Sequence, residues 1–108
     1  MYTTYTLQRA NAGHRVSLRV RIEGLLVDDD NAEKFAMHGL NPRQVLQILA
    51  NRYVIMRNRK RRRAQYLLIG RDDGGICIAI PIEATRDKLI WRPVTAWHCK
   101  YYEEAKLT

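Results

Sequence analysis

The sequence MRNRKRRRAQYLLIGRDDGGICIAIPI, residues 56–82, predicts the central element of the fold. Two apolar runs, residues 66–69 and 76–82, flank a turn sequence, RDDGG, at 71–75. An Asp-Gly turn between two β-prone runs favours a hairpin, because glycine accepts the positive φ that a tight turn needs. In the second run an isoleucine occupies every second position, a period typical of a strand with one buried face. We therefore expect a β-hairpin at the centre of the chain.

A dense cationic run precedes the hairpin, and six of the seven residues 57–63 are Arg or Lys. The whole chain has 19 Lys and Arg against 11 Asp and Glu, which gives a net charge of +8. A surface of this charge attracts polyanions. We expect the run to bind a polyanion, which could be RNA, DNA or an acidic segment of a partner protein. The alternatives are a solvated charge run and a repulsive loop with no partner. Its candidate binding residues are Arg57, Arg59, Lys60, Arg61, Arg62 and Arg63.

A chain of 108 residues is long enough to form one domain with its own core. Within residues 1–108, the first 13 are either flexible or an added strand, and 14–108 form the core. Two helices are expected near 31–38 and from Pro42, because Gly39 and Asn41 are good helix stop and N-cap residues. Segregated helices and strands predict the α+β class. The expected architecture is an antiparallel sheet packed against an N-terminal two-helix hairpin and a C-terminal helix at 97–107. In this helix we expect Tyr101 and Ala105 to pack inward and Glu103 and Glu104 to face solvent.

The two cysteines, Cys77 and Cys99, share no metal-ligand spacing. Cys77 alternates with the isoleucines and is therefore expected on the other face of its strand. We expect both cysteines to be free buried thiols, as in a protein of the reducing cytoplasm. No apolar run approaches the roughly 20 residues that a membrane-spanning helix needs, and no signal peptide is apparent. The sequence therefore predicts a cytoplasmic protein that does not enter a membrane.

Three motifs resemble a known family. They are Met37-His38-Gly39-Leu40 at a helix end, IGRDDGG at 69–75 and WRPVTAW at 91–97. Over about residues 22–106 the chain resembles the BrnT-like branch of the RelE/ParE toxin superfamily. The resemblance implies a RelE-like fold and a type II toxin that cleaves RNA without a metal or other cofactor, inhibiting translation. It also implies a cognate antitoxin protein with a DNA-binding module. The toxin is then expected to form either a homodimer or a hetero-oligomer with this antitoxin.

The resemblance and the chemistry of RNA cleavage together indicate a catalytic set. His38 suits proton transfer near neutral pH, whereas Arg92 and Arg71 suit pairing with phosphate oxygens. Each residue also has a structural interpretation. His38 could simply end a helix, where the helix dipole favours it, and Arg92 could form an ion pair.

Aromatic residues near the C-terminus offer a second kind of contact with RNA. Trp97 and His98, with Tyr101 and Tyr102, could stack on bases, although aromatic side chains at this spacing also serve as core residues. Two other functions remain open from the sequence. One is a non-catalytic, basic nucleic-acid-binding protein of toxin-like fold, and the other is a protein whose basic groove receives a partner's acidic helix.

Overall fold

The computed structural model describes residues 3–7, 15–17, 20–58 and 63–108, with side chains described from residue 20 onward. Within these residues the chain is α+β, with one mixed eight-stranded sheet in the order β1-β3-β7-β6-β5-β4-β2 and with β8 also paired to β6. The strands are β1 (Thr3–Leu7), β2 (Arg15–Ser17), β3 (Gly24–Asp28), β4 (Tyr53–Arg57), β5 (Tyr66–Arg71), β6 (Cys77–Ala84), β7 (Ile90–Pro93) and β8 (Trp97–His98). The helices are α1 (Asp29–Met37), α2 (Pro42–Gln47), η1 (Ile48–Ala50), α3 (Tyr101–Glu104) and η2 (Ala105–Leu107).

The central hairpin is confirmed as β5 and β6, which pair antiparallel along their length. Gly75 takes the positive φ of the turn, at 90°. Ile78, Ile80 and Ile82 are fully buried on one face, as their spacing predicted. Ile76 is not part of this stripe: it precedes β6, and its backbone N–H donates to the Asp72 carboxylate at 2.8 Å. The hairpin therefore has one face committed to the main core.

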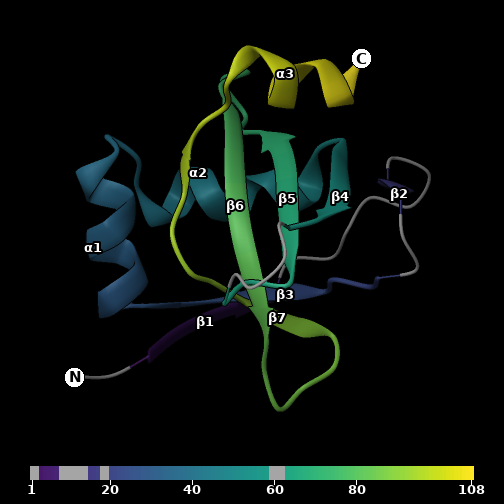
Figure 1. Ribbon diagram of the computed structural model, residues 1–108. Helices are drawn as coiled ribbons and strands as arrows, with labels where there is room; N and C mark the ends of the chain where they lie inside the picture. The colour runs from purple at the N-terminus through teal and green to yellow at the C-terminus, as the bar shows by residue number, and fades with distance from the viewer. Residues whose placement is uncertain (1–2, 8–14, 18–19, 59–62) are drawn as a thin grey trace.

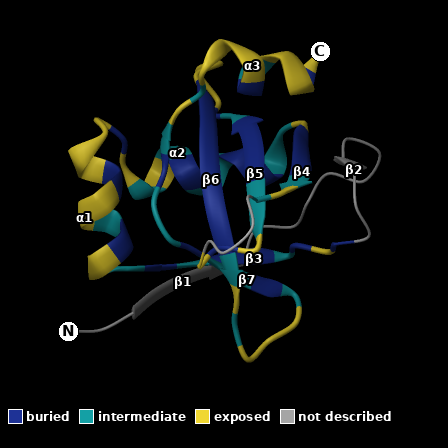
Figure 2. Cartoon of the chain, viewed as in Figure 1, coloured by how far each residue is buried: buried dark blue, intermediate teal, exposed yellow. Residues whose placement is uncertain are grey.

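The main core lies between that face of the sheet and the helices α1 and α2. Phe35 from α1 and Val45 from α2 are fully buried against it, together with Leu49 from η1. Figure 1 shows α2 behind β5 and β6, and α3 with η2 near the C-terminus at one end of these strands. A smaller cluster, including Ile69 and Leu107, lies on the opposite face. In Figure 2 α3 is exposed along much of its length, whereas β5 and β6 are largely buried.

The predicted antiparallel sheet with an N-terminal two-helix hairpin is wrong. The described sheet already includes β3 before α1 begins, so the helices are inserted between strands. The sheet is mixed because β3 pairs parallel with β7, and β2 pairs parallel with β4. β3 lies inside the sheet with β1 and β7 as neighbours, and most of its residues are buried. A strand buried on both faces lacks the alternation that identifies a half-exposed strand.

The predicted helix over 97–107 is also wrong at its start. Trp97 and His98 form β8, which continues along the edge of β6, and the helix begins only at Tyr101. Because the helix begins four residues later than predicted, the side chains that face the sheet differ from the predicted ones. Tyr101, expected to pack inward, has 86% of its surface exposed, whereas Glu103, expected on the solvent side, has only 6%.

The prediction of free thiols is wrong as well, because Cys77 and Cys99 form a disulfide. Cys77 lies on the face of β6 opposite the isoleucines, as predicted, and Cys99 follows β8. The Cys99 backbone N–H donates to the Cys77 carbonyl at 3.0 Å, which places the two residues side by side with Cα atoms 5.3 Å apart. The disulfide therefore ties the start of α3 to the sheet.

Gly70 allows η1 to pack closely on β5. A Cβ at this position would collide with Ile48 Cγ2 and would lie 3.2 Å from Tyr53 Cβ. We expect Gly70→Ala to lower the free energy of unfolding by about 1–3 kcal/mol, the usual cost of overpacking a core. Gly74→Ala is the control, because its Cβ would meet only Asp72 Oδ1, at 3.4 Å. Urea unfolding of both variants tests this, and equal losses would show that Gly70 is not a packing site.

Candidate functional site

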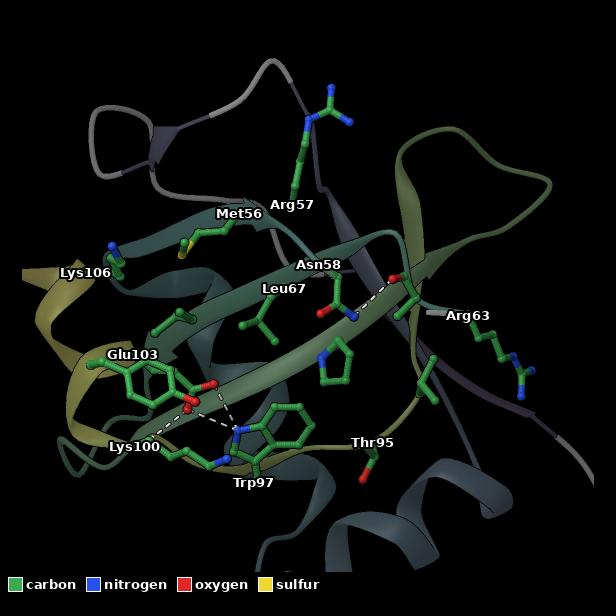
Figure 3. Close-up of a pocket in the computed structure, with 15 residues that line it drawn as sticks. Met56, Arg57, Asn58, Arg63, Leu67, Thr95, Trp97, Lys100, Glu103 and Lys106 are labelled. Atoms are coloured by element: carbon green, nitrogen blue, oxygen red, sulfur yellow. Dashed lines mark hydrogen bonds between the residues drawn. The ribbon is translucent and has the colours of Figure 1, made fainter. Parts of the chain in front are cut away.

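A groove of about 520 Å³ lies on the face of the sheet opposite α1 and α2 (Figure 3). Its floor is apolar and consists of Met56, Leu67, Ile69 and Pro81 from β4, β5 and β6. These residues alternate along their strands with those that face the main core, so the strand period itself places them here. Val94, Thr95 and Trp97 form one side. The other described lining residues are Arg57, Asn58, Arg63, Ala64, Lys100, Tyr102, Glu103 and Lys106. We call this feature the sheet groove.

The sheet groove has basic side chains at its rim. Arg57 at the end of β4 and Lys100 and Lys106 around α3 are exposed and contribute to its lining. Among the residues that the structure describes, no carboxylate forms an ion pair with any of the three. Glu103 is the acidic residue of the described lining. The rim therefore carries a surplus of positive charge over an apolar floor.

Trp97 and Glu103 form a fixed unit inside the sheet groove. The indole Nε1–H of Trp97 donates to both carboxylate oxygens of Glu103, at 3.1 and 3.3 Å. The Lys100 backbone N–H donates to Oε1 of the same carboxylate at 2.8 Å, which caps α3. Figure 3 shows the indole with its nitrogen directed at Glu103 and its six-membered ring extending away from Glu103 across the groove. The carboxylate is therefore occupied by N–H donors of its own segment.

Arg92 lies outside the sheet groove in an ion-pair cluster. Its guanidinium donates to both carboxylate oxygens of Asp28, at 2.9 and 3.1 Å, and to Glu83 at 3.1 Å. Arg63 binds the same Glu83 with two hydrogen bonds, at 2.9 and 3.1 Å. Only 18% of the Arg92 side-chain surface is exposed. Its hydrogen bonds therefore hold β7 to the N-terminus of α1, which Asp28 caps.

The ion pair shifts the pKa of both partners. Burial alone would raise the pKa of Asp28, but the Asn31 backbone N–H and Arg92 together hold the pKa of this carboxyl below its usual range. Burial likewise opposes the charged form of Arg92, and the carboxylates of Asp28 and Glu83 nevertheless raise its pKa. Both groups are therefore charged across the physiological pH range, as a structural ion pair requires.

The three residues predicted to be catalytic belong to three different elements, β5, β7 and the end of α1. Arg71, opposite Cys77 in the sheet, forms an ion pair with Glu104 at 2.8 Å, whereas Arg92 is opposite Glu83. These positions are six residues apart along β6, or roughly 20 Å at the rise of a strand. His38 is the exposed C-cap of α1, about 15 Å along that helix from the cap residue that binds Arg92. The structure therefore brings neither Arg71 nor His38 beside Arg92.

The predicted nucleic-acid-binding residues are divided as well. Arg57, Arg63 and Trp97 line the sheet groove. His98 is exposed and pairs with Ile78, so strand alternation directs it to the face opposite Trp97. The remaining members of the cationic run lie outside the described residues: Arg59, Lys60, Arg61 and Arg62.

Several residues of the sheet groove were not identified from the sequence. Lys100 and Lys106 were not singled out, because a helix over 97–107 would not have placed them beside β4 and β5. Glu103 was assigned to solvent for the same reason. The sequence carries no clear signal for this helix start, because Lys100 occupies the N-cap position, where Ser, Thr, Asp and Asn are preferred.

No protein-family model matches the chain, and neither a search of curated proteins nor a search of solved structures found a significant match. The resemblance to BrnT-like toxins therefore stays a prediction from the quoted motifs.

Proposed function

We propose that this chain binds nucleic acid in the sheet groove, without a catalytic role for the groove itself. The observation that carries the proposal is the set of three exposed cations, Arg57, Lys100 and Lys106, around an apolar floor. Cationic side chains that neutralise phosphates supply most of the affinity in sequence-independent nucleic-acid binding. An apolar and aromatic floor adds contacts with bases.

The charge of the chain as a whole supports the same proposal. Arg57 and Arg63 are the two ends of the cationic run, and both line the sheet groove. Arg63 is already paired with Glu83, so we assign the first contacts with phosphate to Arg57, Lys100 and Lys106. The net charge of +8 would also attract nucleic acid from a distance, which raises the rate of association.

Charge reversal at the rim tests the proposal. We expect Arg57→Glu, Lys100→Glu and Lys106→Glu together to weaken binding of a labelled 20-nucleotide RNA by roughly 100-fold at moderate salt. If the three cations each contact one phosphate, the slope of log K against log salt should become shallower by about 2. Fluorescence anisotropy across a series of salt concentrations measures both quantities.

The matched control reverses three exposed cations elsewhere, Lys34, Arg86 and Lys88. The two triple variants have the same net charge, so a difference between them reports position rather than total charge. We expect the control to lose far less affinity than the rim variant. Equal losses would mean that binding is not located in the sheet groove.

Ribonuclease activity, as in a type II toxin, stays a separate proposal. It is supported by the motifs around His38 and Arg92, whereas the nucleic-acid-binding proposal rests on the groove. Incubation of the protein with bulk RNA in EDTA, with and without ribosomes, tests for metal-independent cleavage. His38→Ala is the preferred variant for this test, because His38 is exposed and its substitution should leave the fold intact. A cognate antitoxin likewise stays a proposal, tested by co-expression with neighbouring genes.

A cytoplasmic location of the protein likewise stays a proposal. No helix in the described part of the chain is long and apolar enough to span a membrane. The expectation of a cytoplasmic protein rested partly on free thiols, whereas Cys77 and Cys99 are paired. Thiol-specific labelling of the protein in intact cells tests the location, because a reducing compartment would leave both residues open to labelling.

A further inference from the structure

The indole ring of Trp97 is held in a fixed orientation in the sheet groove, which suits it to stack on a planar ligand. The hydrogen bonds from Trp97 Nε1 to Glu103 fix the indole by its nitrogen edge. Glu103 is itself held by the Lys100 backbone N–H and is 94% buried. The ring is thus preorganised, with its six-membered part extending across the sheet groove (Figure 3). A preorganised aromatic surface loses little conformational entropy when a ligand stacks on it.

The surroundings of the ring match a planar apolar group attached to an anionic chain. Pro81 and Leu67, which are cross-strand partners, belong to the apolar floor of the same groove. Lys100 and Lys106 lie at the rim around α3, where they could bind the anionic chain while the planar group enters. The volume of about 520 Å³ is that of a small-ligand site rather than of an extended protein interface.

We propose that the sheet groove takes an unpaired base of single-stranded nucleic acid, stacked on Trp97, with the adjacent phosphates on Lys100 and Lys106. The inference rests on the proposed nucleic-acid-binding function. It specifies that the ligand is a single strand with an unpaired base. A duplex does not fit the same contacts, because each base inside it already has its faces covered by neighbouring bases. Stacking tolerates every base, so the site would have little sequence preference.

Tryptophan fluorescence tests the proposal, because the chain has only two tryptophans. Trp91 packs on Tyr66 with the rings 5.4 Å apart, and it belongs to the main core on the other side of the sheet. In a Trp91→Phe variant the remaining signal comes from Trp97. We expect a 12-nucleotide single strand, as RNA or DNA, to quench this signal, whereas heparin should bind without quenching because it has no bases. A duplex of the same sequence should quench far less.

Substitution of Trp97 gives the second measurement. We expect Trp97→Ala to weaken binding of the single strand by about tenfold or more, the usual effect of losing one stacked base, and to leave heparin binding unchanged. Trp97→Phe should recover part of the affinity, because it keeps a ring but loses the hydrogen bonds that orient it. Recovery by Phe also separates stacking from a loss of folding, since Phe lacks the N–H that binds Glu103 just as Ala does.

The outcomes separate this inference from the function on which it rests. If neither heparin nor a single strand binds, the proposed function fails, and the inference fails with it. If both bind but Trp97 is not quenched, only the stacking site is wrong. Equal quenching by duplex would overturn the preference for single strands. Quenching by polyglutamate but not by oligonucleotides would overturn the inference in favour of an acidic protein partner.

Discussion

Arg92→Ala should lower the free energy of unfolding by about 3 kcal/mol, because it leaves two partly buried carboxylates without their common partner. Asp28 would lose two hydrogen bonds from the guanidinium, and Glu83 would lose one. Arg63→Ala is the matched control, since it removes the same kind of side chain from the same Glu83. With 65% of its side-chain surface exposed, Arg63 should contribute less than about 1 kcal/mol. Urea unfolding at pH 7 measures both, and equal losses would contradict the structural role of Arg92.

The pKa of Asp28 gives this ion pair a pH dependence of known sign. Because the folded-state pKa lies below the unfolded value, near 4, the carboxylate stabilises the fold fully above that pH. The contribution is lost as the pH falls through the lower, folded-state pKa. Asp28→Asn should therefore reduce the difference in stability between pH 7 and pH 3. Some difference should remain, because the pKa of Asp72 is lowered too, by hydrogen bonds from Gln44 and the turn that outweigh its burial.

Reduction of the Cys77–Cys99 disulfide should lower the free energy of unfolding about as much as Arg92→Ala does. The bridge closes a loop with a sequence separation of 22, for which the chain-entropy model gives about 3 kcal/mol. Urea unfolding with and without a dithiol reductant measures this loss. The Cys77→Ser, Cys99→Ser double variant is the control, since the reductant should not affect it. Two reactive thiols in the denatured, unreduced protein would show that the bridge does not form.

Local features of the fold were predictable from the sequence. The turn and the isoleucine period of the central hairpin fix its register over a few residues, and the N-cap at Asn41 with Pro42 correctly starts α2. Gly39 takes the predicted positive φ, at 74°, where α1 ends. Each of these signals depends on neighbours within about four residues, where propensity and capping act.

The sheet order depends on contacts that no local pattern contains. β3 meets β7 only after 66 residues of chain, as Gly24 pairs with Ile90. The buried run of β3 fits a strand or a buried helix segment equally well, because periodicity distinguishes neither. The disulfide is equally nonlocal, since Cys77 and Cys99 meet only when residues 97–99 pair beside β6.

Only the part of the candidate site that depends on local sequence signals was predictable. The cationic run stands out in composition, and Trp97 was identified as an aromatic candidate. Lys100 and Lys106 join Arg57 only through the disulfide and the packing of Leu107 on the sheet. Arg92 illustrates the opposite case: its structural alternative, an ion pair, was weighed from the sequence, and the contacts with Asp28 and Glu83 match it.

Binding in the sheet groove is tested most directly by a ¹H–¹⁵N spectrum of the wild-type protein during titration with a 12-nucleotide single strand. The two indole N–H groups give separate side-chain signals, one bound to Glu103 in the sheet groove and one bound to the Arg21 carbonyl on the other side of the sheet. We predict that the Trp97 indole signal moves with the degree of binding, whereas the Trp91 signal stays in place. A saturated complex in which the Trp97 signal does not move, or in which only the Trp91 signal moves, would contradict binding in the sheet groove.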